Sequence, residues 1–188
     1  LVPCGDNYTK LLVKNQDKLR PFYAFACMSQ ETFDKVESKE VFYSSCEKAG
    51  FSFPKTSVCS YENYRSFEPP FDFPVVVKPS NSVAYWNCSF PRKKKVFVAQ
   101  TAKELGDILA AIYSSEYKDH IIIQDFIPGD DSYMRVLNCY SGTDGKVQLI
   151  SLGEALLEEH SPEGIGSYAA IISGHDEKVS EQVRSFLD

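Results

Sequence analysis

Apolar residues recur at helical spacing in several stretches of the chain. After Thr101, leucine and isoleucine return every three or four residues from Leu105 to Ile112. This period places them on one side of a helix, and a threonine just before such a run is a favoured N-cap. Similar patterns predict further helices over residues 6–19, 29–36, 39–48 and 176–188. Gly50 follows the third of these in the position expected for a C-cap.

Other apolar runs are short and continuous or alternate with polar residues, which is typical of strands. Val75–Val77 and Lys78 lie between two prolines, so we expect a buried strand that ends near Lys78. Residues 120–127 form a second buried strand, and Asp144-Gly145 predicts a hairpin turn. Further strands are expected over residues 21–26, 53–58, 95–99, 132–140, 146–157 and 168–173.

The order of these elements predicts an α+β fold. Helices come first, a strand–loop–strand–helix–strand segment follows, and a meander of strands comes next. A doubly wound sheet would require strict alternation of strands and helices. The polar residues 80–94 are expected to form a loop, and a lobe boundary is expected near Phe53.

Composition and charge narrow the possible partners. The 188 residues carry a net charge of −6, which argues against a broad contact with nucleic acid. The basic run Arg92–Lys95 is therefore interpreted as a solvated turn. A single triphosphate needs only a few local cations, so a nucleotide remains compatible with this charge.

Cysteine usage and hydropathy indicate a cytoplasmic protein. The six cysteines form no CxxC pair, and the chain is too long to resemble a disulfide-stapled secreted domain. No apolar run approaches the roughly 20 residues of a membrane span, and polar residues interrupt any signal-like segment at the start. The sequence does not indicate an oligomeric state.

Lys78 is the first candidate for chemistry. A lysine at the end of a buried strand either extends its ammonium into solvent or meets an anion such as a phosphate. The residues that follow, Ser80, Asn81 and Ser82, carry hydroxyl, amide and backbone donors that could fold over phosphate oxygens.

A second candidate begins where the strand over residues 120–127 ends. Gln124, Asp125, Phe126 and Ile127 lead into Pro-Gly, and an opened strand of this kind exposes backbone N–H and C=O groups that match the edge of adenine. The carboxylates that follow, Asp131 included, lie where a ribose would bind. The alternative is an ordinary strand with an acidic turn.

Two further cations have open interpretations. Arg135 lies between apolar residues of a predicted strand, so it either pairs with a carboxylate or reaches a phosphate. Lys39 begins a predicted helix, where its charge opposes the helix dipole, and this favours a role other than stability.

Together these segments resemble the ATP-grasp superfamily over most of the chain. Residues 39–56 are similar to the first helix of that family and its "G-hydrophobic-x-x-P-x-T" segment, "FPVVVKP" to its phosphate strand, and "IIIQDFIPGDD" to its adenine hinge. The phrases "QDFIPGDDSYMRVL" and "LLEEHSPEGIGSYAAII" resemble a carboxylate–amine ligase subgroup that includes D-aspartate ligases.

The resemblance implies a role for each matching residue. Lys39 and Lys78 would contact ATP phosphates under a mobile loop formed by residues 80–84. Gln124 to Ile127 would bind adenine, Asp131 the ribose, and Arg135 the reacting phosphate or acyl group, which makes it the catalytic candidate. Glu158, His160 and Gly166 would border the substrate. The family's phosphate loop is often rich in glycine, whereas Ser80–Ala84 contains none.

The resemblance also implies an ATP-dependent ligation of a carboxylate to an amine through an acylphosphate, with small molecules or peptides as substrates. A protein kinase would show a Gly-rich loop before the lysine and HRD and DFG triplets after it, and these are absent from the sequence. A non-catalytic nucleotide-binding or interaction module remains the alternative.

The resemblance implies three parts: the end of a preceding lobe with its helices in residues 1–52, the small ATP-grasp lobe in 53–126, and the start of the large lobe in 127–188. The family's magnesium ligands lie in a later "E-x-N" strand, so we expect no metal ligand in this chain and Mg²⁺ to be held elsewhere. Both ends of the chain look cut, and we expect it to be a piece of a longer protein that is inactive alone.

Overall fold

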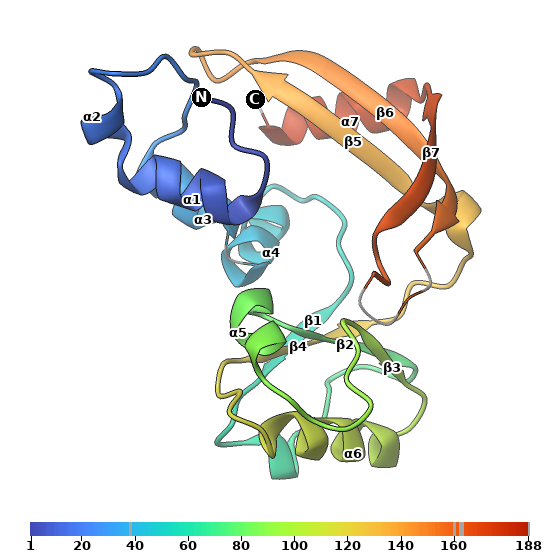
Figure 1. Cartoon of the computed structure of the whole chain (residues 1–188). Helices are drawn as coiled ribbons and strands as arrows, with labels where there is room; N and C mark the ends of the chain where they lie inside the picture. The colour runs from blue at the N-terminus through green and yellow to red at the C-terminus, as the bar shows by residue number, and fades with distance from the viewer. Residues whose placement is uncertain (38, 160, 162–163, 188) are drawn as a thin grey trace. The chain divides into compact units, whose positions relative to one another are not determined.

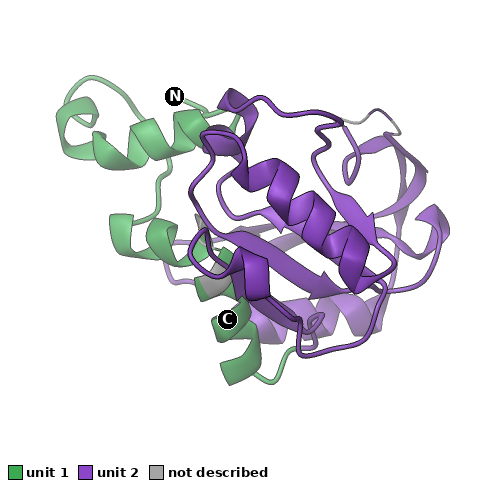
Figure 2. Cartoon of the chain, turned by 90° about the horizontal axis from the view of Figure 1, so that it is seen from below, with its two compact units in different colours: residues 1–51 green, residues 52–188 purple. Residues whose placement is uncertain are grey.

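The computed structural model of the chain describes residues 1–37, 39–159, 161 and 164–187. The chain divides into two compact units, residues 1–51 and residues 52–188 (Figure 2). The predicted division of the second part into two lobes at residue 126 stays a prediction.

The first unit is helical in its described part. It contains α1 (Asp6–Lys14), α2 (Gln16–Leu19), α3 (Gln30–Glu37) and α4 (Lys39–Lys48). The backbone of α4 ends in a Schellman arrangement: Gly50 has φ 65°, its N–H bonds to the Glu47 carbonyl at 3.1 Å, and Phe51 bonds to the Cys46 carbonyl at 2.8 Å. The predicted C-cap at Gly50 is confirmed.

Two sequence predictions for this unit are wrong. The single helix expected over residues 6–19 is interrupted at Asn15, whose side-chain amide donates to the Leu11 carbonyl at 2.8 Å. Such side-chain bonds compete with the helical backbone pattern. The strand expected over residues 21–26 does not form, and Phe22 is 78% exposed, because this apolar run has no partner strand among the described residues.

The second unit begins with a four-stranded antiparallel sheet, the first sheet. Its strands are β1 (Thr56–Cys59), β4 (Ile121–Asp125), β2 (Val75–Pro79) and β3 (Phe97–Ala99), in that order across the sheet. The helix α6 (Ala102–Tyr113) runs along the sheet (Figure 1). Thr101 caps α6 as predicted, since its hydroxyl accepts the Glu104 N–H at 3.2 Å.

The core of the second unit lies between this sheet and α6. Val75, Val77, Ile121 and Ile123 each have no exposed surface, and they pack with the leucines of α6. Alternate residues of β2 are buried, as expected for a strand with one core face.

The segment between β2 and β3 differs from its prediction. The loop expected over residues 80–94 contains a short helix, α5 (Ser82–Asn87), because Tyr85 is 1% exposed and belongs to the core. The basic run is more than a solvated turn: Lys93 donates to the carbonyls of Trp86 at 2.9 Å and Cys88 at 2.6 Å. These contacts hold the C-terminal end of α5.

The second sheet is a meander of β5 (Arg135–Ser141), β6 (Val147–Glu158) and β7 (Tyr168–Gly174). The predicted hairpin between β5 and β6 is confirmed, with Gly145 at φ 79° in its turn. The helix α7 (Glu177–Leu187) contacts β6 (Figure 1), and the guanidinium of Arg184 donates to the Val147 carbonyl.

Two 3₁₀ turns complete the described elements: η1 (Tyr64–Ser66) and η2 (Asp131–Tyr133). Helices accompany two sheets in which every strand pair is antiparallel, so the α+β class is confirmed. Within the described residues, none of the helices has the length and apolar character needed to span a bilayer.

Candidate functional site

Lys78 lies on the face of the first sheet that points away from the core. Val75, Val77 and Pro79 are buried, whereas Lys78 and Val76 alternate with them and are half-buried. The register pairs Lys78 with Ile122 of β4. Ile122 is fully buried although it is not part of the core cluster that packs against α6. The Lys78 side chain therefore begins beside an apolar neighbour on its face of the sheet.

The residues after β2 are closely bonded to the chain before β4. Ser80 donates both its N–H, at 3.0 Å, and its hydroxyl, at 2.8 Å, to the carbonyl of His120. The Asn81 side chain accepts the Ala84 N–H at 3.0 Å and so caps α5. Ser82 is the first residue of α5 and is exposed. Its hydroxyl is therefore open to solvent, beside the capped start of α5.

The hinge after β4 combines a fixed strand end with unpaired backbone. Gln124 is 4% exposed and donates its side-chain amide to the Thr56 hydroxyl at 2.7 Å, which ties β4 to β1. Asp125 donates its N–H to the Lys55 carbonyl at 2.9 Å. In the described part of the chain, no hydrogen bond engages the backbone of Phe126 or Ile127.

The sheet register sets the spacing between these two elements. Lys78 faces Ile122, and Phe126 follows four residues later, directly after the end of β4. At about 3.3 Å per residue, the backbones at Lys78 and Phe126 are about 13 Å apart along the ladder. This separation is comparable with the length of an extended nucleoside triphosphate. The sheet thus offers a cation near one end of the ladder and open backbone groups at the other.

Asp131, Glu158 and Gly166 are connected by hydrogen bonds. The Asp131 carboxylate accepts the Glu158 N–H at 3.0 Å, and the Glu158 carboxylate accepts the Gly166 N–H at 2.6 Å. Gly166 has φ 84°, a backbone conformation that favours glycine. The predicted ribose ligand and two predicted substrate neighbours therefore lie together. His160, also predicted to border the substrate, lies outside the described residues.

Arg135 lies beside a carboxylate in this structure, and its predicted contact with a phosphate stays a prediction. It is the first residue of β5 and faces Glu154 of β6, with 3.7 Å between its guanidinium and that carboxylate. The guanidinium also donates to the carbonyls of Ser132 at 2.7 Å and Met134 at 3.1 Å. The pair is partly exposed, so it contributes little to stability and leaves the cation within reach of a ligand.

The neighbouring carboxylate Asp130 is held by Ser132. The hydroxyl of Ser132 donates to it at 2.6 Å and the Ser132 N–H at 3.0 Å, and these bonds lower the pKa of Asp130. Lys39 is the half-buried first residue of α4, in the first unit, and its predicted contact with a phosphate stays a prediction.

No metal centre is evident in the part of the chain that the structure describes. Among those residues, no group of three or more histidines, cysteines or carboxylates is placed to hold an ion.

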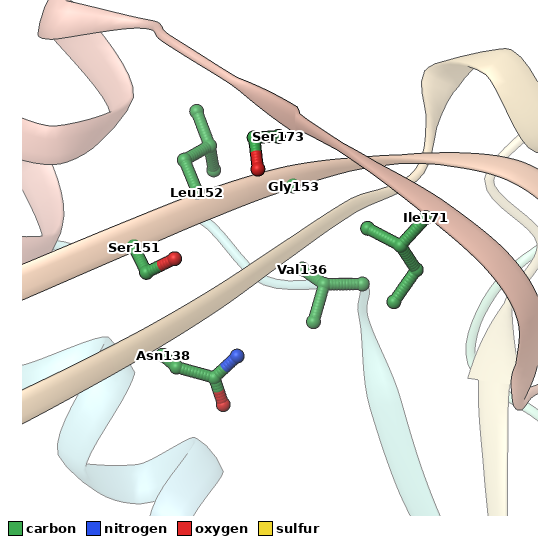
Figure 3. Close-up of a pocket in the computed structure, with 7 residues that line it drawn as sticks. All are labelled: Val136, Asn138, Ser151, Leu152, Gly153, Ile171 and Ser173. Carbon is green, nitrogen blue, oxygen red and sulfur yellow. The ribbon is translucent and has the colours of Figure 1, made fainter.

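A separate hollow of about 120 Å³ lies on the second sheet (Figure 3). Apolar and polar side chains surround the bare backbone of Gly153: Val136, Asn138, Ser151, Leu152, Ile171 and Ser173. None of the predicted site residues lines this hollow. Ile171 lies directly over Gly153, where an added Cβ would come within 2.4 Å of its methyl group. The glycine at position 153 thus makes room for the Ile171 side chain beside the hollow.

The segment Glu154 to Ser167 was expected to border the substrate, but sequence analysis missed the pairing of Glu154 with Arg135 and the contacts of Thr56 and Tyr117 with the predicted site. Thr56 fixes the Gln124 side chain, Glu154 pairs with Arg135, and the Tyr117 hydroxyl accepts the Asn81 N–H at 3.4 Å. Thr56 and Tyr117 are 68 and 36 residues from their partners, a separation that local sequence patterns do not bridge. The strand pairing predicted after residue 132 could have indicated Glu154.

Comparison with known proteins gives the family context. No protein-family model matches the chain. The chain is 38% identical over 192 residues to a D-aspartate ligase of Enterococcus faecium, a match that covers 100% of the chain and 46% of that protein. The chain thus spans about half the length of this curated relative.

Solved structures share the fold at low identity. An L-amino acid ligase from Bacillus licheniformis aligns with a TM-score of 0.59 and 16% identity, covering 93% of this chain and 37% of that one. A D-alanine–D-alanine ligase from Helicobacter pylori aligns with a TM-score of 0.55 and 19% identity, covering 93% and 50%. The chain therefore has the fold of the ATP-grasp ligases and is a relative of a D-aspartate ligase, of which it matches about half.

Proposed function

We propose that the chain is the ATP-binding portion of a ligase that joins a carboxylate to an amine through an acylphosphate. The observation that carries this proposal is the pairing of β2 with β4: Lys78 lies on β2, and the unpaired backbone of Phe126 and Ile127 directly follows the end of β4. The relatedness to a D-aspartate ligase supports the same conclusion.

The two ends of the ladder suit the two ends of ATP. The N–H and C=O groups of Phe126 and Ile127 would bond the adenine edge, which presents one donor and one acceptor. Lys78 would meet the phosphates with a full positive charge, and the hydroxyls of Ser80 and Ser82 would add donors. Asp131 uses one carboxylate oxygen for the Glu158 N–H, and its other oxygen would accept from a ribose hydroxyl.

In the proposed reaction, the protein would position the substrates and neutralise the charge on the phosphates. A substrate carboxylate oxygen would attack the γ-phosphorus, the bond to the β-phosphate oxygen would break, and ADP would leave. The amine nitrogen would then attack the acyl carbon, phosphate would leave, and the nitrogen would lose a proton. Arg135 and Lys78 would stabilise the charge that develops on the phosphoryl group.

Magnesium would supply further neutralisation of the phosphates. Since the described residues offer no cluster of metal ligands, we assign no residue of this chain to the ion. Glu158, Gly166 and, in the undescribed stretch, His160 would border the carboxylate and amine substrates, which are small molecules or peptides.

Titrations of the chain with ATP and with adenosine, monitored by saturation-transfer NMR, test the proposal. We expect the chain to bind ATP weakly, because the phosphates are held without their metal. Lys78→Gln should weaken ATP binding by about tenfold or more, the usual worth of a charged hydrogen bond, and leave adenosine binding unchanged. Lys103→Gln is the matched control. Lys103 lies in the first turn of α6, forms an ion pair with Asp107, and has a side chain that is 86% exposed. Equal ATP affinity in the Lys78 and Lys103 variants would remove Lys78 from the site.

A further inference from the structure

The carbonyl of His120 receives hydrogen bonds from two segments. Ser80 contributes its N–H at 3.0 Å and its hydroxyl at 2.8 Å, and Tyr117 contributes its hydroxyl at 2.9 Å. Ser80 lies two residues after Lys78, so this carbonyl fixes the chain where the proposed phosphate contacts begin. Tyr117 lies between α6 and β4 and belongs to none of the predicted site segments.

A backbone carbonyl has two lone pairs, so three donors exceed its full capacity. The N–H of Ser80 cannot rotate, whereas each hydroxyl can turn about its C–O bond. When the Ser80 N–H and the Tyr117 hydroxyl occupy the carbonyl, the Ser80 hydroxyl is free to turn toward another acceptor at little cost. An oxygen of a phosphate held by Lys78 is such an acceptor.

The environment of Tyr117 suits a fixed donor. Its side chain is 1% exposed, and its ring meets the ring of Tyr85 edge-on at 5.5 Å, so it packs against α5 as well. Its hydroxyl oxygen also accepts the Asn81 N–H at 3.4 Å. Burial raises the pKa of Tyr117 above its ordinary value, against hydrogen bonds from Ser80 and Asn81 that lower it, so the hydroxyl stays protonated and able to donate at neutral pH.

We propose that Tyr117 is a positioning residue for the phosphate-binding segment: its buried hydroxyl, between the His120 carbonyl and the Asn81 N–H, holds Ser80 and Asn81 beside Lys78 and leaves the Ser80 hydroxyl available to a phosphate oxygen. This inference rests on the proposed function. It adds a residue that touches no part of the nucleotide and acts through Ser80 and Asn81.

The chain offers a closely matched control in Tyr113. Tyr113 is 3% exposed, lies in the same core, and donates its hydroxyl to the carbonyls of Cys59 at 3.0 Å and Asp119 at 3.2 Å. Tyr113→Phe and Tyr117→Phe each remove one buried hydroxyl from the same cluster. We expect a similar loss of stability from both.

Amide hydrogen exchange tests the positioning without any ligand. In Tyr117→Phe, the Asn81 amide loses its acceptor, so exchange at Asn81 should quicken by about three- to tenfold relative to Tyr113→Phe. Equal exchange at Asn81 in the two variants would overturn the inference. This result does not depend on ATP, so it stands apart from a failure of the proposed function, which an absence of ATP binding in the unmodified chain would show.

The binding arm compares ATP with adenosine. Tyr117→Phe should weaken ATP binding by about three- to tenfold and leave adenosine binding unchanged, whereas a general loss of structure would weaken the binding of both. Ser80→Ala should weaken ATP binding in the otherwise unmodified chain. In the Tyr117→Phe background it should weaken ATP binding little further, because the Ser80 hydroxyl there bonds to the lone pair of the His120 carbonyl that the Tyr117 hydroxyl has vacated. Additive effects of the two substitutions would contradict the proposed release of the Ser80 hydroxyl.

Discussion

The two sheets of the second unit are built on the same antiparallel pattern but differ in how much they bury. In the first sheet, Val75, Val77, Ile121 and Ile123 have no exposed surface. In the second sheet, large apolar side chains remain between 48% and 62% exposed: Leu149, Leu156, Leu157, Ile171 and Ile172. Alternation of apolar and polar residues thus predicts a strand equally well in both, but it does not predict whether the apolar face is covered.

The helices that accompany the sheets explain the difference. Within α6, Leu105, Leu109 and Ile112 are at most 2% exposed and fill the space under the first sheet. None of the described residues of α7 is buried. A residue on the first sheet therefore has a rigid support, and this is where Lys78 and the hinge lie. The comparison teaches that the proposed nucleotide contacts rest on a completed core, whereas Arg135 and Glu158 lie on the less buried second sheet.

Matched isoleucine truncations should show the largest contrast between the sheets. Ile123→Ala removes a fully buried side chain of the first sheet and should lower the free energy of unfolding by about 2–5 kcal/mol. Ile171→Ala removes one that is 48% exposed on the second sheet and should cost less than about 1 kcal/mol. Urea unfolding followed by circular dichroism measures both. Equal losses would show that the second sheet depends on a core as much as the first.

A buried and an exposed cysteine give a smaller contrast. Burial raises the pKa of Cys59 in β1 to about 11 from its ordinary value of 9.0. Above pH 9 the thiol ionises in the unfolded chain before it does in the folded one, so stability should fall between pH 9 and pH 11. The part of the fall due to Cys59 is about 1–3 kcal/mol.

Urea midpoints at pH 8 and pH 10.5 test this fall in two variants. Cys59→Ala should reduce the dependence on pH, while Cys139→Ala, which removes an exposed thiol of the second sheet, should leave it unchanged. An identical pH dependence in the two variants would contradict the assignment to Cys59.

Much of the fold follows from local sequence signals. The prolines around Val75–Val77, the cap at Thr101 and the Asp-Gly turn at Asp144 each act within a few residues, and each predicted its element. The break of the first helix at Asn15 is a local side-chain effect, whereas two other misses involve tertiary contacts. Six residues are too few for a helical period to stand out, and α5 forms where Tyr85 enters the core. Residues 21–26 are apolar enough for a strand but have none to pair with among the described residues.

The candidate site shows the same limit. The sequence indicated Lys78 and the hinge at Phe126 as separate features, because a strand end and a Pro-Gly break are local. Their spacing depends on the register of β2 with β4, which no local pattern specifies. Tyr117 was missed for the same reason, since its partners near residue 80 come close only in the folded chain.

Amide chemical shifts of the ¹⁵N-labelled chain during an ATP titration test most directly whether Lys78 and Phe126 serve one nucleotide. ATP should shift the amides of residues 78–82 and of residues 124–127 together, with one shared dissociation constant, and adenosine should shift only the second group. Shifts confined to one group, or two groups that titrate with different constants, would contradict a single nucleotide site on the first sheet.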